Sequence, residues 1–346
     1  MRRTFAALLA AAISLGGCAG PSPLGSIAAG PAARPDWAAY YAYSRGMLED
    51  KQISRQPKSG YSLERWELLS PEPGTRPIHL DWYRTARPGR RPLVILSPIL
   101  AGDDLYIREF AAFYAARGMQ AVIVYRQKEV FSADRPLKDV EEHFRKTVIE
   151  LRQALDWLET QEGVDPEKIG SFAISLGAIL TVILAAVEPR IRCSVFGLPA
   201  GHVAEIIMTS QDKAIRKRRR AYLEKRGWDK ARGLAELKAV IRSEPMLLAP
   251  QVDPKRALMI IGLFDRVLGL GRSLDLWRAM GRPKLIVLPT GHYTAYFATP
   301  YLKIATYSFF REKLGESSSS TSSRKCFPVA AGCRPEAIAI HSSGNA

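Results

Sequence analysis

The sequence predicts an α/β fold, with a mostly parallel sheet of about eight strands that carries helices on both faces. Between residues 61 and 314, short apolar runs alternate with stretches of helical periodicity, as they do in proteins built from βαβ units with right-handed crossovers. Several runs, such as Leu93-Val-Ile-Leu96, are continuously apolar, which is typical of strands buried on both faces of a parallel sheet. The length of 346 residues and a hydrophobic content of 47% suit one large globular domain.

Residues 1–17 have the pattern of a removable targeting segment. Arg2 and Arg3 precede an apolar run from residue 5 to residue 15, which is shorter than the roughly 20 residues that a membrane-spanning helix needs. Leu15-Gly-Gly-Cys18 then closes the segment and resembles the lipobox of bacterial lipoproteins. That resemblance implies cleavage before Cys18, a lipid on its thiol and, since no aspartate follows, an outer-membrane location facing the periplasm. The alternative is an ordinary secretory signal with an incidental cysteine.

Residues 18–60 are predicted to lead from Cys18 to the folded domain. Up to residue 35 they are rich in alanine, glycine, proline and serine, as a flexible tether is. A helix is predicted over residues 36–56. The domain itself is expected to span residues 61–315.

The domain opens with two strands whose alternation of apolar and polar residues indicates a half-exposed antiparallel pair. Buried strands and amphipathic helices then alternate, and Gly118 ends the first of these helices. The strands are predicted at 61–69, 78–83, 93–96, 121–125, 168–174 and 193–198, and the helices at 104–117 and 140–161.

After the sixth predicted strand, residues 200–250 contain only basic, amphipathic helices. Ligands of parallel α/β sheets bind at the carboxyl ends of the strands, so we expect this insertion to lie above that edge as a lid. Strands resume at 257–261 and 284–288, and a last helix covers 294–314. Residues 316–346 begin with a serine- and threonine-rich run and show no periodicity, which predicts a disordered tail.

The net charge of +16 is concentrated in part between Lys213 and Arg232. In a cytosolic protein the run Arg216-Lys-Arg-Arg-Arg220 would indicate nucleic-acid binding, but an exported protein rarely meets nucleic acid, and we expect none as a partner. Anionic lipid head groups are one alternative counter-charge, and a solvated helix face is the other.

Cysteine and histidine positions do not predict a metal site or a cofactor. Cys193 lies in an apolar strand pattern and is expected to be a buried free thiol. Cys326 and Cys333 lie in the tail, where an oxidising compartment would allow them to pair. No cluster has metal-ligand spacing, and the five histidines are scattered.

The strongest chemical signal is Ser175. It lies between a buried strand and an apolar helix, with the small residues Ala173 and Gly177 on either side, as in a nucleophile elbow. A serine needs a base and a group that orients that base. Asp265 and His292 each follow an apolar strand, in the chain order Ser, Asp, His.

Other residues of these types are less well placed. Asp253 and Asp275 are rivals of Asp265, but neither follows a buried strand directly. The histidines other than His292 are His79, in a strand pattern, His143, on a helix face, His202, at the start of the insertion, and His341, in the tail. Of these, His202 alone could touch a substrate.

With these motifs, the chain resembles the α/β-hydrolase-fold serine esterases and lipases over residues 61–314. The resemblance rests on Ser-Pro-Ile-Leu-Ala-Gly102, Ala-Ile-Ser-Leu-Gly177, Gly-Leu-Phe-Asp265 and Gly-His292. It implies Ser175 as nucleophile, His292 as general base and then acid, and Asp265 as the residue that orients His292.

The family pattern also implies an oxyanion hole of two amide donors. The first is expected at Leu176, the first residue of the helix after Ser175. The second is expected in the loop after the third predicted strand, where Ser97-Pro98 replaces the common His-Gly pattern. Pro98 has no amide proton, so Ile99 is the candidate and Leu100 the alternative.

The function that follows is hydrolysis of a small-molecule or lipid carboxylic ester through an acyl-enzyme, without cofactor or metal, at the bacterial envelope. An acyltransferase on the same triad and a non-catalytic scaffold remain as alternatives. The apolar residues of the insertion suit an apolar acyl group but equally suit helix packing. The sequence does not identify the substrate or the oligomeric state.

Overall fold

The structure, a computed structural model, describes residues 35–69, 76–99, 105–126 and 131–315. Contacts within the chain separate two units, Met1–Ala42 and Tyr43–Ala346. In the first unit, the described residues form a short helix, α2 (Trp37–Tyr40), whose first turn is capped by the Asp36 side chain through a bond of 3.0 Å from the Ala39 amide. The predicted signal peptide, Cys18, most of the tether and the tail at 316–346 lie outside the described residues.

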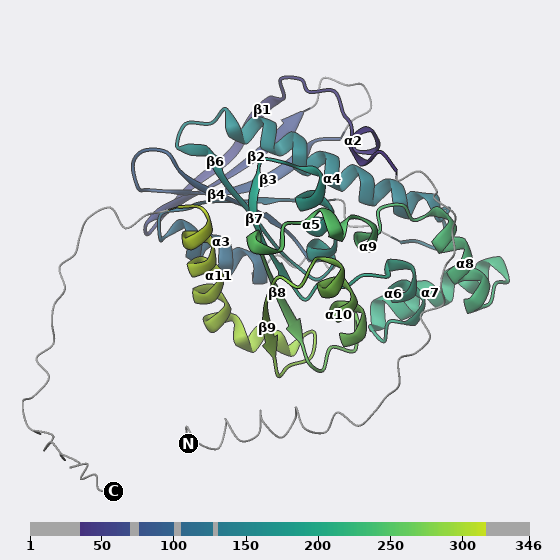
Figure 1. Cartoon of the computed structure of the whole chain (residues 1–346). Coiled ribbons are helices and arrows are strands. Elements are labelled where there is room, and N and C mark those ends of the chain that lie inside the picture. The colour runs from purple at the N-terminus through teal and green to yellow at the C-terminus, as the bar shows by residue number, and fades with distance from the viewer. Residues whose placement is uncertain (1–34, 70–75, 100–104, 127–130, 316–346) are drawn as a thin grey trace, which may run out of the picture. The chain divides into compact units, whose positions relative to one another are not determined.

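The second unit is built on a nine-stranded sheet in the order β1-β2-β3-β5-β4-β6-β7-β8-β9 (Figure 1). The pairs β1–β2, β2–β3 and β3–β5 are antiparallel, and all later pairs are parallel. The strands are β1 (Glu49–Lys58), β2 (Tyr61–Leu69), β3 (Ile78–Thr85), β4 (Arg91–Ser97), β5 (Gln120–Val124), β6 (Val164–Ile174), β7 (Ile191–Gly197), β8 (Ala257–Gly262) and β9 (Lys284–Leu288). The predicted, mostly parallel sheet is confirmed.

The additional strand is β1, and the helix predicted over residues 36–56 is wrong across it. Nearly every side chain of β1 is exposed, so no alternation of apolar residues marks it as a strand. Its stability comes from backbone pairing with β2 through the two-residue turn Ser59-Gly60, where Gly60 has a φ of 83° that glycine adopts without strain. Exposed charged residues are typical of edge strands, because they discourage pairing with other chains.

Helices cover both faces of the sheet (Figure 1). On β6, Phe172 and Ile174 belong to one hydrophobic cluster and Ala173, between them, to the other, because side chains alternate across a strand. The first cluster includes residues of α3 (Leu105–Ala115) and α11 (Thr299–Lys313), and the second includes residues of α5 (Leu176–Val187) and α10 (Leu270–Ala279). The long helix α4 (Lys138–Glu159) packs beside α5.

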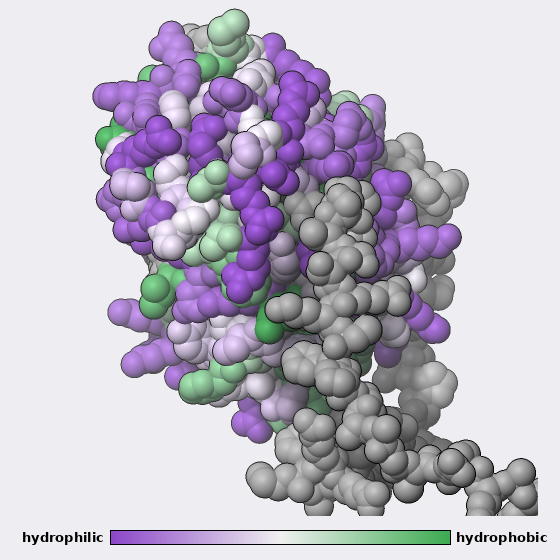
Figure 2. Space-filling model, turned by 90° about the vertical axis from the view of Figure 1, so that its left-hand side faces the viewer, coloured by the Kyte–Doolittle hydropathy of each residue, from purple (hydrophilic) through white to green (hydrophobic). Residues whose placement is uncertain are grey.

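The surface seen from the side of α3 and α11 is mostly hydrophilic, with hydrophobic residues dispersed among the polar ones (Figure 2). Cys193 is a buried free thiol, as predicted. Within the described part of the chain, no helix is long and apolar enough to cross a membrane.

The helical insertion follows β7, which is the seventh strand because β1 precedes those predicted. It contains α6 (Val203–Thr209), α7 (Lys213–Arg226), α8 (Lys230–Val240) and α9 (Pro245–Leu248), in agreement with the helices predicted there. The link between α8 and α9 is bonded to α4 through the buried carboxylate of Glu141. That carboxylate accepts hydrogen bonds from the Arg242 amide (2.8 Å), the Ser243 amide (2.8 Å) and the Ser243 hydroxyl (2.7 Å).

Candidate active site

Ser175 stands at a sharp turn between β6 and α5. Its backbone has φ 58° and ψ −126°, a conformation that is strained for any residue with a Cβ atom. The turn is held in place by a hydrogen bond of 2.8 Å from the Ser175 amide to the carbonyl of Gly197, at the end of the neighbouring strand β7. Helix α5 begins at the next residue. The backbone therefore has the strained strand-to-helix geometry expected of a nucleophile elbow.

Gly177 is required by the close approach of the loop after β4. A Cβ atom on Gly177 would lie 2.7 Å from the carbonyl oxygen of Pro98 and 2.8 Å from that of Ser97, distances that real Cβ atoms do not tolerate. It would also lie 3.3 Å from the Cβ atom of Ala173. Because Gly177 has no side chain, the methyl group of Ala173 fits where this motif more often has a second glycine.

Asp265 and His292 lie on adjacent loops at the carboxyl edge of the sheet. Asp265 follows β8, and His292 follows β9, its parallel neighbour. The two loops are joined by hydrogen bonds from the Leu263 amide to the Leu288 carbonyl (2.9 Å) and from the Phe264 amide to the Thr290 carbonyl (3.0 Å). These bonds hold the loops that carry the two side chains against each other.

The three predicted side chains form one hydrogen-bonded chain. The Oγ atom of Ser175 lies 2.9 Å from Nε2 of His292, and Nδ1 of His292 lies 2.7 Å from Oδ2 of Asp265. Because an ionised carboxylate can only accept, Nδ1 carries the proton and donates a hydrogen bond to Asp265. The neutral ring then has a lone pair on Nε2, which accepts the hydroxyl proton of Ser175.

Asp265 is buried and fully hydrogen-bonded. Its Oδ1 atom accepts from the amides of Val267 (2.8 Å) and Leu268 (3.0 Å). Burial by itself raises the pKa of this carboxyl, but the hydrogen bond and charge of His292 and the two amide donors outweigh it, so that the pKa of Asp265 lies below its ordinary value. Asp265 is therefore ionised at neutral pH and can stabilise a protonated His292.

The predicted oxyanion donors belong to segments that touch each other. Leu176 is the first residue of α5, where helical amides have no partner within the helix. Ile99 follows Pro98, whose carbonyl oxygen packs against Gly177, and the Ile99 carbonyl accepts a hydrogen bond from the guanidinium of Arg126. The oxyanion roles of both amides stay predictions, and the alternative donor Leu100 lies outside the described residues.

The rival residues have other partners. Asp253 caps a short 3-10 helix through the Lys255 amide (2.9 Å), and Asp275 pairs with Arg278 (2.9 Å). His79 lies 3.6 Å from Glu67 on the sheet, and His202 lies 3.7 Å from Asp275. His143 is buried in α4, where burial lowers its pKa to about 4. His341 lies outside the described residues.

Sequence reasoning missed two contacts near the site. The hydroxyl of Tyr293, the residue after His292, donates to Asp212, whose other oxygen caps the start of α7 by accepting from the Ile215 amide (2.8 Å). The insertion is thereby bound beside His292. The second contact is that of Arg126 with Ile99. Arg126 follows the carboxyl end of β5, and this position is the one feature of the sequence that could have indicated it.

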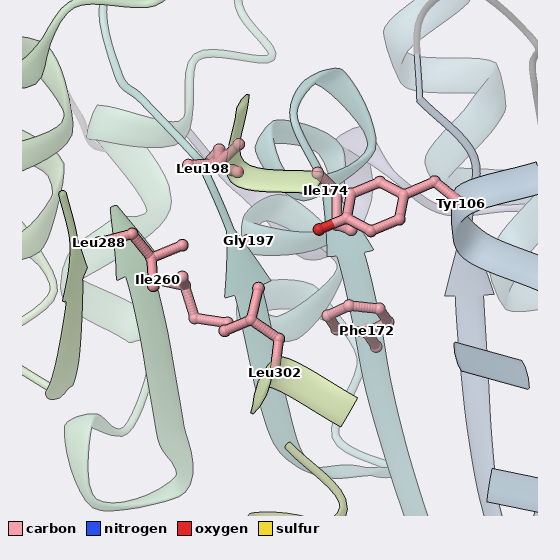
Figure 3. Close-up of a pocket in the computed structure, with 9 residues that line it drawn as sticks. Tyr106, Phe172, Ile174, Gly197, Leu198, Ile260, Leu288 and Leu302 are labelled. Carbon is pink, nitrogen blue, oxygen red and sulfur yellow. The ribbon is translucent and has the colours of Figure 1, made fainter. Parts of the chain in front are cut away.

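A small apolar pocket of about 10 Å³ lies beneath the carboxyl ends of β6 and β7. Figure 3 shows the ring of Tyr106 extending from α3 toward Ile174, the residue before Ser175. The pocket is lined by Tyr106, Phe172, Ile174, Gly197, Leu198, Ile260, Leu288, Ala295 and Leu302. This volume has room for about one water molecule, so it is a gap in the core packing rather than a site for a whole substrate.

Solved structures with the same architecture are numerous. An acetyl xylan esterase from Paenibacillus sp. R4 is similar over 80% of this chain and 92% of its own, with a TM-score of 0.64 and 16% identity. Acetyl xylan esterase 1 from Thermoanaerobacterium sp. JW/SL YS485 covers 78% of this chain and 92% of its own, with a TM-score of 0.59 and 16% identity. The chain has the α/β-hydrolase fold. A cold-adapted esterase from an Arctic intertidal metagenomic library shares this fold, with a TM-score of 0.53 and 19% identity over 78% of this chain and 100% of its own.

Similarity at the level of sequence is weaker. No protein-family model matches the chain. Uncharacterized proteins from two strains of Mycobacterium tuberculosis are 25% identical over 169 residues, which are 49% of this chain. The matched segment spans only 38% of the length of these relatives. Among the described residues of this α/β-hydrolase fold, no group of three or more histidine, cysteine, aspartate or glutamate side chains could hold a metal ion.

Proposed function

We propose that this protein is a serine hydrolase that cleaves carboxylic esters through an acyl-enzyme. The observation that supports this most strongly is the hydrogen-bonded chain from Ser175 through His292 to Asp265, placed at a strained turn of an α/β-hydrolase fold. A scaffold protein has no physical need for three such residues in mutual contact, and each link of the chain serves the activation of a serine hydroxyl.

In the first half of the reaction, Nε2 of His292 takes the hydroxyl proton while Oγ of Ser175 attacks the ester carbonyl carbon. The carbonyl oxygen becomes an oxyanion, which the amides of Leu176 and Ile99 stabilise. His292, now protonated and balanced by Asp265, gives its proton to the departing alcohol as the carbon–oxygen bond breaks. The acyl group remains on Ser175.

In the second half, His292 removes a proton from a water molecule, which attacks the acyl carbon. A second oxyanion forms at the same amides, and it collapses as Ser175 regains its proton from His292. The products are a carboxylic acid and the alcohol released earlier. If another alcohol replaces water in this step, the product is a new ester, which is the acyltransferase reaction.

Labelling with a fluorescent fluorophosphonate tests the proposal, because this probe phosphonylates activated serines. We expect labelling of the native chain, none of Ser175→Ala, and normal labelling of Ser54→Ala, which alters a serine on the edge strand β1. Hydrolysis of short-chain aryl esters should fall on the order of 10³-fold or more in Ser175→Ala. Absence of labelling and of hydrolysis in the native chain would contradict the proposal and favour a scaffold. Transfer to an added alcohol in excess of hydrolysis would favour the acyltransferase.

We further propose that the enzyme works at the bacterial envelope, held by a lipid on Cys18, and that the insertion at 200–250 acts as a lid. The sequence Leu15-Gly-Gly-Cys18 supports the first part. The bond between Tyr293 and Asp212, which ties the start of α7 to the residue beside His292, supports the second. Small periplasmic esters and lipid esters are both accessible from such a position.

A further inference from the structure

We propose that the entrance of the active site is itself a membrane-binding surface, made of exposed aromatic side chains and the basic start of α7, and that it takes anionic phospholipid bilayers as its partner. This inference rests on the proposed function only in naming the entrance. The surface consists of Phe264, Tyr293 and Phe297 together with Lys213, Arg216 and Lys217.

The aromatic part is unusually exposed for its size. Phe264 is 61% exposed, Tyr293 68% and Phe297 80%. A single exposed hydrophobic side chain is normal on a protein surface, whereas several in one place mark an interaction site. Withdrawal of one phenylalanine side chain from water into an apolar phase strengthens binding on the order of tenfold.

These aromatic residues belong to the two loops that carry Asp265 and His292. The amide of Phe264 is bonded to the carbonyl of Thr290 (3.0 Å), and Tyr293 stacks edge-on against the His292 ring at 5.4 Å between ring centroids. Phe297 follows within the 3-10 helix η3 (Thr294–Ala298), four residues and therefore about 8 Å beyond Tyr293. All three come from the loops after β8 and β9, at the carboxyl edge of the sheet.

The basic part adjoins the aromatic part directly. The hydrogen bond from Tyr293 to Asp212 places the cap of α7 beside the site, and Lys213, Arg216 and Lys217 are the first, fourth and fifth residues of that helix. These residues therefore lie within about 8 Å along the helix axis from the cap. All three are exposed, and none forms an ion pair within the described part of the chain.

This arrangement of charge disfavours the helix that carries it. Cations near a helix N-terminus oppose the helix dipole, and the spacing of Lys213 to Lys217 places two like charges one turn apart. Of the later cations of α7, Arg220 is paired with Glu224 and Lys225 with Asp134. Unpaired charge at a position where it weakens the helix is explained if an external anionic surface stabilises it.

A lipid surface can bind both the basic residues of α7 and the exposed aromatic side chains. Anionic head groups attract lysine and arginine, each of which contributes a several-fold gain in binding near a charged bilayer. Aromatic side chains insert at the boundary between head groups and acyl chains. A nucleic acid would meet the charges but would leave the phenylalanines in water, so the combination favours a bilayer.

Sedimentation with lipid vesicles tests this surface without requiring catalysis. The mature chain left by the predicted cleavage is used with Cys18→Ser, so that neither the apolar run of the leader nor an acyl chain contributes, and again with Ser175→Ala added. We expect binding to vesicles of phosphatidylcholine with phosphatidylglycerol, little binding to phosphatidylcholine alone, and weakening by added salt. The same result with Ser175→Ala would separate membrane binding from hydrolysis, so that failure of one proposal is distinguishable from failure of the other.

Matched variants locate the binding. Arg216→Gln with Lys217→Gln should weaken binding on the order of tenfold, whereas Lys51→Gln with Lys58→Gln removes the same charge from exposed positions of β1 and should not. Phe297→Ser should weaken binding by a similar factor, and Ile53→Ser, at an exposed position near β1's centre, should not. Circular dichroism and thermal unfolding verify that each variant is folded.

The proposal is overturned if no vesicle binds, if charged and neutral vesicles bind equally, or if the α7 pair behaves like the β1 pair. Binding of a DNA duplex, lost in the α7 pair and without binding to vesicles, would assign the surface to nucleic acid instead and would also overturn it.

Discussion

At the scale of single residues, the site depends on the protonation state of one ring. His292 can act as a base toward Ser175 only if its proton is on Nδ1, and the carboxylate of Asp265 secures this because it has no proton to donate. Asp265 is in turn fixed by the amides of Val267 and Leu268. Its pKa below the ordinary value keeps it ionised across the neutral and mildly acidic range.

Asp265→Asn tests this dependence. An asparagine keeps the shape but can present its amide protons to Nδ1, which favours the wrong tautomer and leaves Nε2 protonated toward Ser175. We expect kcat for a short aryl ester to fall on the order of 10⁴-fold with KM little changed. Asp275→Asn, at a partly exposed carboxylate paired with Arg278, serves as the control. A fall of less than tenfold in Asp265→Asn would argue against this role.

At the scale of elements, the junction of β6 and α5 is shaped by the loop after β4. The carbonyl oxygens of Ser97 and Pro98 pack where a side chain of Gly177 would be. The same loop carries Ile99, the proposed second oxyanion donor. The position of the Ile99 amide therefore depends on the absence of a side chain at Gly177.

Gly177→Ala tests that coupling. The added methyl group must displace the loop, so we expect a loss of stability of about 1–3 kcal/mol and a fall in kcat on the order of tenfold or more. Gly271→Ala is the matched control, because nothing lies within 4 Å of the methyl group it would add in α10, and it should be neutral or slightly stabilising. Unchanged kcat in Gly177→Ala would separate the loop from catalysis.

At the scale of the whole molecule, the parallel order β6-β7-β8-β9 assembles the site. Ser175 and His292 are 117 residues apart in the chain, and His292 and Asp265 are 27 apart. Each ends up at the same edge because parallel strands end together there. The insertion connects the carboxyl end of β7 to β8, which is why its first helices lie beside the site.

The stability of the molecule should also depend on pH through a histidine that the site does not use. Burial lowers the pKa of His143 from 6.5 to about 4, with smaller contributions from Arg126 and Arg135. The unfolded chain therefore binds a proton at a higher pH than the folded one does. This contribution to stability is complete above pH 6.5 and is lost as pH falls toward 4.

His143→Phe should remove that dependence. We expect its unfolding free energy, measured with urea, to change less between pH 6.5 and 4 than that of the native protein, by up to a few kcal/mol. His79→Gln, at an exposed position of β3, should retain the native slope. An unaltered slope in His143→Phe would show that other groups carry the pH dependence.

The proposed lipid anchor predicts that Cys18 is acylated in cells. Cells that express the native chain should incorporate labelled palmitate into it, and the protein should fractionate with membranes. Cys18→Ser should abolish incorporation, whereas Cys193→Ser, at a buried thiol, should not. Continued labelling of Cys18→Ser would contradict the anchor.

Much of this architecture could be predicted because it depends on local pattern. β4, β5 and β8 are buried on both faces and so contain continuous apolar runs. Ser175, Asp265 and His292 each follow a short apolar run at the end of a parallel strand, so their meeting was predictable from the rule that parallel strands share an edge. β1 could not be predicted, because its exposed side chains carry no periodicity and its stability comes from backbone bonds to β2.

The sequence by itself determined the class of fold, the three candidate catalytic residues and their chain order. Buried strands are apolar, and the polar residues that directly follow them mark where each strand ends. Only the tertiary structure decided the hydrogen-bond geometry of that chain, the need for Gly177, the contact of Arg126 with Ile99, and the joining of α7 to the site through Tyr293 and Asp212. Such contacts unite residues far apart in the chain, and no local pattern records which polar side chains will meet after folding.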